Sequence, residues 1–282
     1  FIRSYRREHS VYRLCRVLGV SRSGFYDWLF RPESRRARAN QHLLHDIQRV
    51  HQQSRQSYGA LKIWKVLRAE GIACGKHRVA RLRREHSITT RRRRRFVTTT
   101  HARRHASVAP HILERRFESG VPNRVWVGDV TFVPTRKGWV YLAVLLDLYS
   151  RKVVGWSMSN QNDKALVLGA LSMAIDHRNP RPGLLHHTDR GSVYTADEYR
   201  KMLSEHGMIS SMSRTGECWD NAVAESFFGN LKNELTCGRT FETHDQAKSA
   251  IFEYIEVFYN RQRLHQTLGY QSPHAYEMKA VA

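Results

Sequence analysis

The pattern of apolar and polar positions divides the chain into a helical first part and a second part in which strands and helices follow one another. In the first part, apolar residues recur every three or four positions, which predicts amphipathic helices. From Val125 onward, the segment VWVGDVTFV carries apolar residues on both faces, as a central strand of a sheet does. The segments GWVYLAVLLDLYS and RKVVGWSMS predict two further strands of an antiparallel meander.

The first helical unit covers Val11 to Leu29. Its pattern predicts a helix, a tight turn at Gly19 and a second helix capped by Ser21, which is helix-turn-helix spacing. Arg22 would project from the start of the second helix. An ordinary helical hairpin has the same periodicity. The residues of the first helix that are predicted to face inward are Leu14, Val17 and Leu18.

A second unit of the same kind is predicted over residues 36–90. A helix from Leu61 to Ala69 ends at Gly71, and a basic helix follows from Lys76 to Glu85. The predicted core residues are Leu61, Trp64, Val66, Leu67, Val79 and Leu82. The basic residues left for phosphates are Lys76, Arg78, Arg81, Arg83 and Arg84. The segment RPESRRARAN, between the two units, is predicted to be a linker or an exposed helix.

The positive charge is concentrated in the first part of the chain. The formal net charge is +22, and residues 1–110 hold 27 Lys and Arg against 6 Asp and Glu, whereas residues 111–282 hold 20 against 19. A polyanion-binding region joined to a balanced globular domain is the simplest interpretation, and nucleic acid is the commonest polyanion. Ribosomal and membrane-surface proteins share this composition. The basic run suited to a DNA backbone is Arg91, Arg92, Arg93, Arg94 and Arg95, although a nuclear-import signal looks similar.

The order of elements after Val125 predicts the fold class. The three strands are followed by a helix, a short strand ending at Asp189, a second helix, a last strand and a final helix. This is the order of an α/β core of RNase H-like, retroviral integrase-like fold, here preceded by an all-α helix-turn-helix region. In that fold the first and fourth strands are neighbours, which would bring Asp129 close to Asp189.

The final helix, within Thr215 to Leu235, carries a third carboxylate, Glu225. Asp220 or Asn221 is the predicted N-cap. The apolar stripe consists of Val223, Phe227, Leu231 and Leu235. Glu225 lies about 200° around the helix from Phe227. It shares a polar face with Asn221, Gly229 and Lys232. A solvated helix face is the ordinary explanation of such a pattern.

Three acidic side chains on two strands and one helix favour metal-dependent chemistry at phosphorus. An aspartate in an apolar strand needs a hydrogen-bonded network or a metal. Two divalent ions about 4 Å apart would activate a water or a 3′-hydroxyl and stabilise the leaving oxygen. Oxygen ligands favour Mg²⁺, with Mn²⁺ as a substitute. Asp147 is better explained by a role at a strand end or turn. His186 and His187 are left out as structural residues.

Motifs over nearly the whole chain resemble the integrase-type transposases of IS-three family insertion sequences, usually called OrfB. They are LCRVLGVSRSGFYDW, SYGALKIWKVLRAEGI, VWVGDVTFVPT, LDLYSRKVVGWSMS, HHTDRGSVYT, CWDNAVAESFFGNLKNE and YNRQRLHQTLGYQSPHAYE. The spacing of the three acids, with a basic residue seven positions after Glu225, is the most specific of these features.

The resemblance implies that Asp129, Asp189 and Glu225 are the metal-binding catalytic triad and that Lys232 contacts the terminal DNA of the element. It implies strand cleavage that leaves 3′-hydroxyls, and transfer of those ends without a covalent enzyme intermediate. It implies terminal inverted repeats and target DNA as partners. An upstream-frame OrfA product or fusion is a further possible partner. Because two DNA ends must be joined in concert, a homo-oligomer is expected.

Five segments are predicted: a helix-turn-helix at 1–35, a second one at 36–90, a basic linker at 91–119, the catalytic core at 120–238 and a helical tail at 239–282. The tail offers Arg261, Arg263 and His265 as DNA contacts, with a solvated helix end as the alternative. No apolar run is long enough to span a bilayer, and a cytoplasmic, nucleoid-associated protein is predicted. The four cysteines form no C-x-x-C pair.

Two rival functions remain open. One is a sequence-specific DNA-binding regulator whose RNase H-like domain is inert. The other is a general nuclease, which would hydrolyse DNA without strand transfer. Acidic residues at all three positions argue against the regulator, because an inert domain has no use for them.

Overall fold

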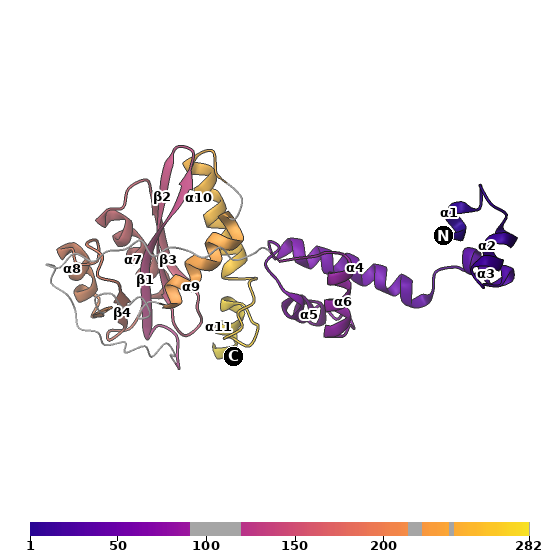
Figure 1. The fold of residues 1–282 in the computed structure, drawn as a ribbon. Helices are drawn as coiled ribbons and strands as arrows, with labels where there is room; N and C mark the ends of the chain where they lie inside the picture. Colours follow the sequence, from indigo (N-terminus) through magenta and orange to yellow (C-terminus); the bar gives the residue numbers. More distant parts are fainter. Residues whose placement is uncertain (91–119, 214–221, 237–239, 282) are drawn as a thin grey trace.

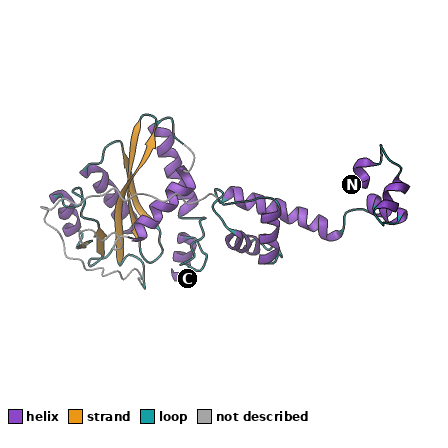
Figure 2. Ribbon diagram, viewed as in Figure 1, coloured by secondary structure: helices purple, strands orange, loops and turns teal. Residues whose placement is uncertain are grey.

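The computed structural model describes residues 1–90, 120–213, 222–236 and 240–281, which form two helical units followed by an α/β unit (Figure 1). The first unit contains α1 (Ile2–Tyr5), α2 (Val11–Val17) and α3 (Arg22–Phe30). The second contains α4 (Arg35–Gln53), α5 (Ala60–Ala69) and α6 (Lys76–Glu85). Helices account for every regular element before residue 90, and the strands all lie in the third unit (Figure 2).

The predicted helix, turn at Gly19 and second helix of the first unit are confirmed. Gly19 turns the chain with φ +65°, and the Ser21 hydroxyl accepts a hydrogen bond of 3.0 Å from the Gly24 amide at the start of α3. The predicted inward face of α2 is partly wrong, because Val17 is 83% and Leu18 47% exposed. Helix α2 ends at Val17, and its buried residues, Leu14 and Cys15, lie earlier in the helix. The core of the unit consists of Ile2, Leu14, Cys15 and Phe25.

The second unit has its own core, and its longest helix was not predicted. The sequence indicated only a linker or exposed helix near the start of α4, yet this 19-residue helix buries apolar side chains along its second half. In α5 the buried residues are Ile63 and Leu67; Leu61, predicted as core, is 39% exposed. The predicted inward face of α6 is confirmed. The core of the unit consists of Leu43, Ile47, Val50, Tyr58, Ile63, Leu67, Val79 and Leu82.

The third unit is built on a five-stranded sheet with the order β3-β2-β1-β4-β5. Its strands are β1 (Val125–Thr135), β2 (Gly138–Asp147), β3 (Val153–Ser159), β4 (Leu185–Thr188) and β5 (Ile209–Met212). β1 to β3 form the predicted antiparallel meander, and β4 and β5 join it in parallel. β1 is the central strand, and the predicted adjacency of the first and fourth strands is confirmed.

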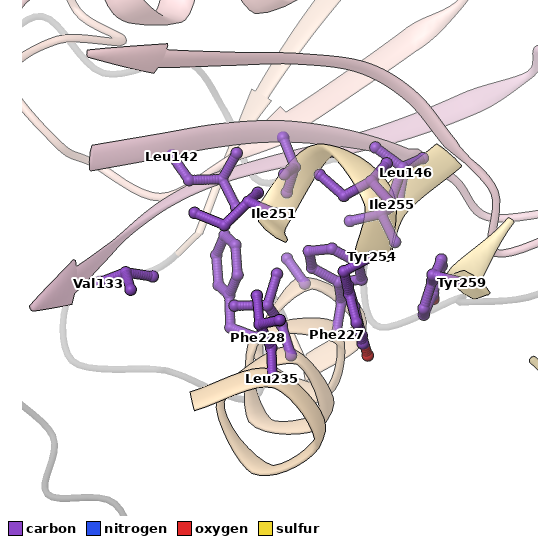
Figure 3. Close-up of a cluster of buried hydrophobic side chains, with 14 of the residues drawn as sticks. Val133, Leu142, Leu146, Phe227, Phe228, Leu235, Ile251, Tyr254, Ile255 and Tyr259 are labelled. Atoms are coloured by element: carbon purple, nitrogen blue, oxygen red, sulfur yellow. The ribbon is translucent and has the colours of Figure 1, made fainter. Parts of the chain in front are cut away.

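Helices cover both faces of this sheet. On one face lie α7 (Lys164–Arg178) and α8 (Asp197–Glu205). On the other lie α9 (Ala222–Leu231), the π-helical turn η2 (Lys232–Thr236), α10 (His244–Glu253) and the π-helical turn η3 (Tyr254–Tyr259). Figure 3 shows Phe227 and Leu235 of this second layer packed with Ile251 and Tyr254 below Leu142 of the sheet. The segment after residue 240 is therefore part of the same hydrophobic core, and it ends with α11 (Pro273–Val281).

Aspartate side chains fix a helix start and a strand end in this unit. Asp163 caps α7 by accepting a hydrogen bond of 3.0 Å from the Leu166 amide. Asp147 ends β2, where its carboxylate accepts hydrogen bonds from the amides of Asn123 (2.7 Å) and Tyr149 (2.9 Å). Its predicted structural role is thereby confirmed. Among the helices of the described residues, none is long and apolar enough to cross a membrane.

Candidate active site

Asp129 lies in the middle of the central strand β1, half-buried and opposite Val144 of β2. Because side chains alternate along a strand, it lies on the same side as Val127 and Val133, which belong to the core under α9. Its Oδ1 accepts a hydrogen bond of 2.7 Å from the next amide, that of Val130. The other face of β1 holds Trp126, which packs toward α7. The carboxyl of Asp129 is thus directed to the α9 side of the sheet.

Asp189 follows directly after β4, the parallel neighbour of β1. The register pairs Val127 with His187. Asp129 and Asp189 each lie two residues further along the chain, so they lie side by side. The Oδ1 of Asp189 accepts a hydrogen bond of 2.9 Å from the Gly191 amide. A Cβ at Gly191 would lie 2.9 Å from that oxygen, so a larger residue here would require the Asp189 carboxylate to shift. The topology therefore brings the two aspartates together, as predicted.

Glu225 projects from the first turns of α9 and is solvent-exposed. The predicted apolar stripe is confirmed at Phe227, Leu231 and Leu235, which are buried, whereas Val223 is half-buried. The proposed caps, Asp220 and Asn221, and the aromatic Trp219 lie outside the described residues. Glu225 thus stands on the polar face of a helix whose apolar face is fixed in the core.

Lys232 begins the π-helical turn η2, immediately after α9. Its Nζ lies 5.1 Å from the centre of the Phe132 ring on β1, a cation–π contact. Partial burial lowers the pKa of Lys232, while the charge of Asp129 acts to raise it. Lys232 is therefore held beside β1, within electrostatic reach of Asp129.

The electrostatics connect these four side chains. The pKa of Asp129 is raised well above its ordinary value, first by burial and then by the negative charges of Asp189 and Glu225, while Lys232 acts to lower it. Burial also raises the pKa of Asp189 and that of Glu225. The charges of Asp189, Glu225 and Lys232 thus all act on Asp129.

Tyr194 is a neighbour of this cluster that the sequence did not single out. It is fully buried, and burial together with the charges of Tyr199, Asp129 and Asp189 raises its pKa. It lies in the turn between β4 and α8. Its closeness to Asp189 in the sequence is the signal that could have identified it. The two histidines before Asp189 are structural: His186 hydrogen-bonds the Tyr199 hydroxyl at 2.7 Å. His187 bonds Ser211 at 2.9 Å and Ser213 at 3.1 Å.

The chemistry of the donor set suits a hard divalent cation. Three carboxylates supply oxygen ligands, and the mutual repulsion felt at Asp129 is what a bound cation would relieve. Within the part of the chain that the structure describes, no group of three or more His, Cys, Asp and Glu side chains is arranged to hold a metal ion as it stands. The three carboxylates therefore suit a divalent cation in ligand type and in charge.

The predicted DNA-binding residues fall into three sets. Arg22, Lys76 and Arg84 are exposed. Arg78 and Arg81 are half-buried and bonded within their own unit, Arg78 Nε to Asn40 Oδ1 at 2.8 Å and Arg81 Nη1 to Glu85 at 2.9 Å. The run from Arg91 to Arg95 lies outside the described residues.

Two of the tail residues suggested as DNA contacts are buried instead. Arg263 forms a two-pronged ion pair with Glu234, with Nη2 2.8 Å from Oε1 and Nε 2.9 Å from Oε2. His265 lies beside it, with Nε2 3.3 Å from Arg263 Nη1. The prediction was wrong for these two because charge in the sequence does not show whether an internal partner exists. Arg261 is exposed.

Comparison with known proteins shows the family. Residues 38–96 match the HTH-like domain family, and residues 121–218 and 225–281 match two integrase core domain families. The chain is 38% identical, over 100% of its length and 99% of the relative, to the transposase InsF for insertion sequence IS3A of Escherichia coli strain K12. The chain belongs to the IS3-family insertion-sequence transposases. The predicted family and RNase H-like fold class are thereby confirmed.

Two further relatives are similar to this chain at about the same level of identity. An insertion element IS600 protein of 31 kDa from Shigella sonnei is 43% identical over 94% of this chain and 98% of its own length. The transposase for IS904 of Lactococcus lactis is 39% identical over 82% of this chain. Among solved structures, the HTLV-2 integrase catalytic core domain in complex with magnesium is 20% identical, covers 56% of this transposase-family chain and has a TM-score of 0.43.

Proposed function

We propose that this chain binds the ends of an insertion sequence and catalyses Mg²⁺-dependent DNA strand cleavage and strand transfer through Asp129, Asp189 and Glu225. The observation that carries the proposal is electrostatic. The pKa of Asp129 on the central strand is raised first by burial of its carboxyl and then by the charges of two carboxylates from separate elements, Asp189 and Glu225. Titratable groups with strongly perturbed pKa values cluster at functional sites.

The three acidic residues have distinct positions in this proposal. Asp129 and Asp189, on adjacent parallel strands, would hold the cation from the sheet, with Mn²⁺ as a substitute for Mg²⁺. Glu225 would complete the ligand set from the exposed face of α9. When bound, the cation would neutralise charge at phosphorus and activate a water or a 3′-hydroxyl.

Lys232 has the role of a DNA contact in the proposal. Its ammonium lies beside Phe132 of β1 and is influenced by Asp129. A phosphate of the element end bound there would lie next to the carboxylates that act on it. The upstream helical units, with their exposed cations, would bind the rest of the terminal DNA. Two ends joined in concert require a multimer of the chain. An OrfA product of the upstream frame is proposed as a further partner.

The test is a strand-cleavage and strand-transfer assay with the purified full chain and duplex DNA that carries the element end. We expect Mg²⁺-dependent nicking followed by joining to target DNA, and neither with Glu225→Gln. The matched control is Glu205→Gln, which removes an exposed helical carboxylate of α8 and should leave both steps unchanged. Nicking without joining would favour a general nuclease. DNA binding without nicking would favour the regulator.

A further inference from the structure

The helix that carries Glu225 and Lys232 is anchored on its buried side by an ion pair. Glu234 lies two residues after Lys232, in the π-helical turn η2, and is buried. Arg263 binds both of its carboxylate oxygens, and the Tyr254 hydroxyl donates to Oε2 at 2.8 Å. Tyr254 itself begins the second π-helical turn, η3. Two π-helical turns thus meet at one carboxylate, and such turns are frequent at functional sites.

Each guanidinium nitrogen of Arg263 has a partner, Glu234 for Nε and Nη2 and His265 for Nη1. Burial alone would lower the pKa of Arg263, but the Glu234 carboxylate outweighs burial and leaves that pKa raised. Burial and the Arg263 charge lower the pKa of His265 to about 2, so its ring is neutral and its Nε2 accepts from Arg263. A buried ion pair contributes little net stability compared with apolar residues of the same volume. Its geometric specificity is therefore the better explanation of its presence.

The residue after Arg263 is bound by the second helical unit. The Leu264 amide donates to the Tyr58 hydroxyl at 2.6 Å, and the Leu264 side chain packs on the core of α4 to α6. Lys62 of α5 lies 5.0 Å above the Tyr58 ring and is influenced by the charges of both Arg263 and Glu234. The HTH-like unit, α4 to α6, therefore docks on the residue next to Arg263 and lies within electrostatic reach of the ion pair.

A second contact fixes the same two units. Arg55 forms an ion pair with Glu253 at the end of α10. Its guanidinium lies 5.5 Å from the Tyr254 ring centre and 5.3 Å from that of Phe258. Arg55 has φ +55°, a left-handed conformation that is uncommon outside glycine. The turn after α4 is thus shaped to place this side chain on η3.

We infer that the Glu234–Arg263 pair is a positioning element that couples the docked HTH-like unit to the helix bearing Glu225 and Lys232. The connection runs from α5 through Tyr58 and Leu264 to Arg263, then through Glu234 to η2. DNA bound by the HTH-like unit would in this way set the position of Lys232 and Glu225 at the element end. The consequence for strand transfer rests on the proposed function; the coupling itself does not.

The test is backbone hydrogen exchange of the full chain with the docking contact removed. Arg55→Ala should raise exchange at the Leu264 amide and at the η2 amides of Lys232–Thr236 by about tenfold, because local opening becomes easier. The matched control is Arg49→Ala, which removes an ion pair with Glu70 inside the HTH-like unit and should leave both segments unchanged. Tyr58→Phe, which removes only the hydroxyl acceptor, should raise exchange at Leu264 and, more weakly, in η2.

Unchanged exchange in η2 with Arg55→Ala would overturn the inference, whether or not Leu264 exchange rises. Thermal unfolding of each variant checks that the fold is kept, and Tyr58→Phe provides the same comparison if Arg55→Ala unfolds. In the strand-transfer assay, Arg55→Ala should slow joining about fivefold with unchanged affinity for the element end, as expected for a contact that positions groups. A wild-type chain that transfers no strands would remove the proposed function, while the exchange result would still decide the coupling.

Discussion

Two clusters of charged side chains border the same helical segment, and they differ in how their charges are balanced. On one side, Glu234 is matched by Arg263, with hydrogen bonds on both carboxylate oxygens. On the other, Asp129 is influenced by the like charges of Asp189 and Glu225, with Lys232 as the cation beside them. Segment α9–η2 contributes to both clusters, so the same few turns of chain carry a balanced and an unbalanced arrangement.

The difference distinguishes a cluster with a structural role, around Glu234, from one with a proposed functional role, around Asp129. Burying a charge is costly unless it is paired, and the Glu234 cluster follows that rule. The Asp129 cluster departs from it, since its carboxyls are held near one another at the expense of their ionised forms. Departures of this kind are expected at functional sites, where stability is given up for chemistry. Variants of the two clusters should therefore behave in opposite ways.

The largest effect is expected for Asp129→Asn. Loss of the central carboxylate should reduce strand cleavage by at least about a thousandfold, because a ligand of the reacting centre is lost. Stability should stay the same or rise, because one of three repelling charges is removed. Cleavage rates and chemical denaturation of the same preparation measure both. A variant that loses stability and activity together would contradict the functional interpretation.

Arg263→Ala should have the opposite profile. It leaves Glu234 buried without its cation, and we expect about 3 kcal/mol less free energy of unfolding. Arg261→Ala, two residues earlier and exposed, is the control and should change stability by no more than about 0.5 kcal/mol. Urea denaturation followed by circular dichroism measures the difference. Equal stability of the two variants would show that the ion pair is not buried as described.

A smaller effect is expected from the pH dependence of the docked interface. Burial and the Arg263 charge lower the pKa of Lys62 to about 8, while Glu234 acts to raise it. The unfolded chain therefore binds more protons at this site between about pH 8 and 10.5, and stability should rise with pH across that window. Lys62→Met should remove a rise of about 1–2 kcal/mol.

Unfolding curves at several pH values, compared between wild type and Lys62→Met, isolate this one group. The exposed Lys201→Met on α8 is the control and should keep the wild-type rise. A parallel pH dependence of Lys62→Met and the wild type would contradict the burial of Lys62 at the interface.

The smallest effect concerns the cations of α6. Lys76 is exposed, whereas Arg81 is bonded to Glu85. Lys76→Ala should weaken DNA binding a few-fold on all sequences and reduce the salt slope by about 1, and Arg81→Ala should reduce it less. Fluorescence anisotropy over a range of salt concentrations measures both. A larger slope change for Arg81→Ala would reverse this ranking.

The fold of the α/β unit could be predicted well from the sequence because its signals are local. β1 carries apolar residues on both faces, and the apolar stripe of α9 repeats every four residues. The adjacency of Asp129 and Asp189 needed one further step, the element order of a known fold. The register of β1 with β4 in the structure then places the two aspartates side by side.

The wrong predictions concern which face of a helix is buried and which charged side chains have partners inside the protein. Val17 and Leu18 are apolar but lie at the end of α2, where the helix no longer sets their direction. Leu61 is exposed while Ile63 is buried, because the docking of α4 on α5 selects the face. Arg263 pairs with a glutamate 29 residues away, which no local pattern indicates. The roles of Asp129, Asp189 and Glu225 and the proposed domain boundaries stay predictions.

The central claim is that three carboxylates from three elements act as one metal-dependent centre. The most direct measurement is nicking of element-end DNA over a range of Mg²⁺ concentrations by Asp129→Asn, Asp189→Asn, Glu225→Gln and Glu205→Gln side by side. We predict that the first three show no nicking at any Mg²⁺ concentration and that Glu205→Gln follows the wild-type curve. Wild-type nicking by any one of the first three would contradict the claim.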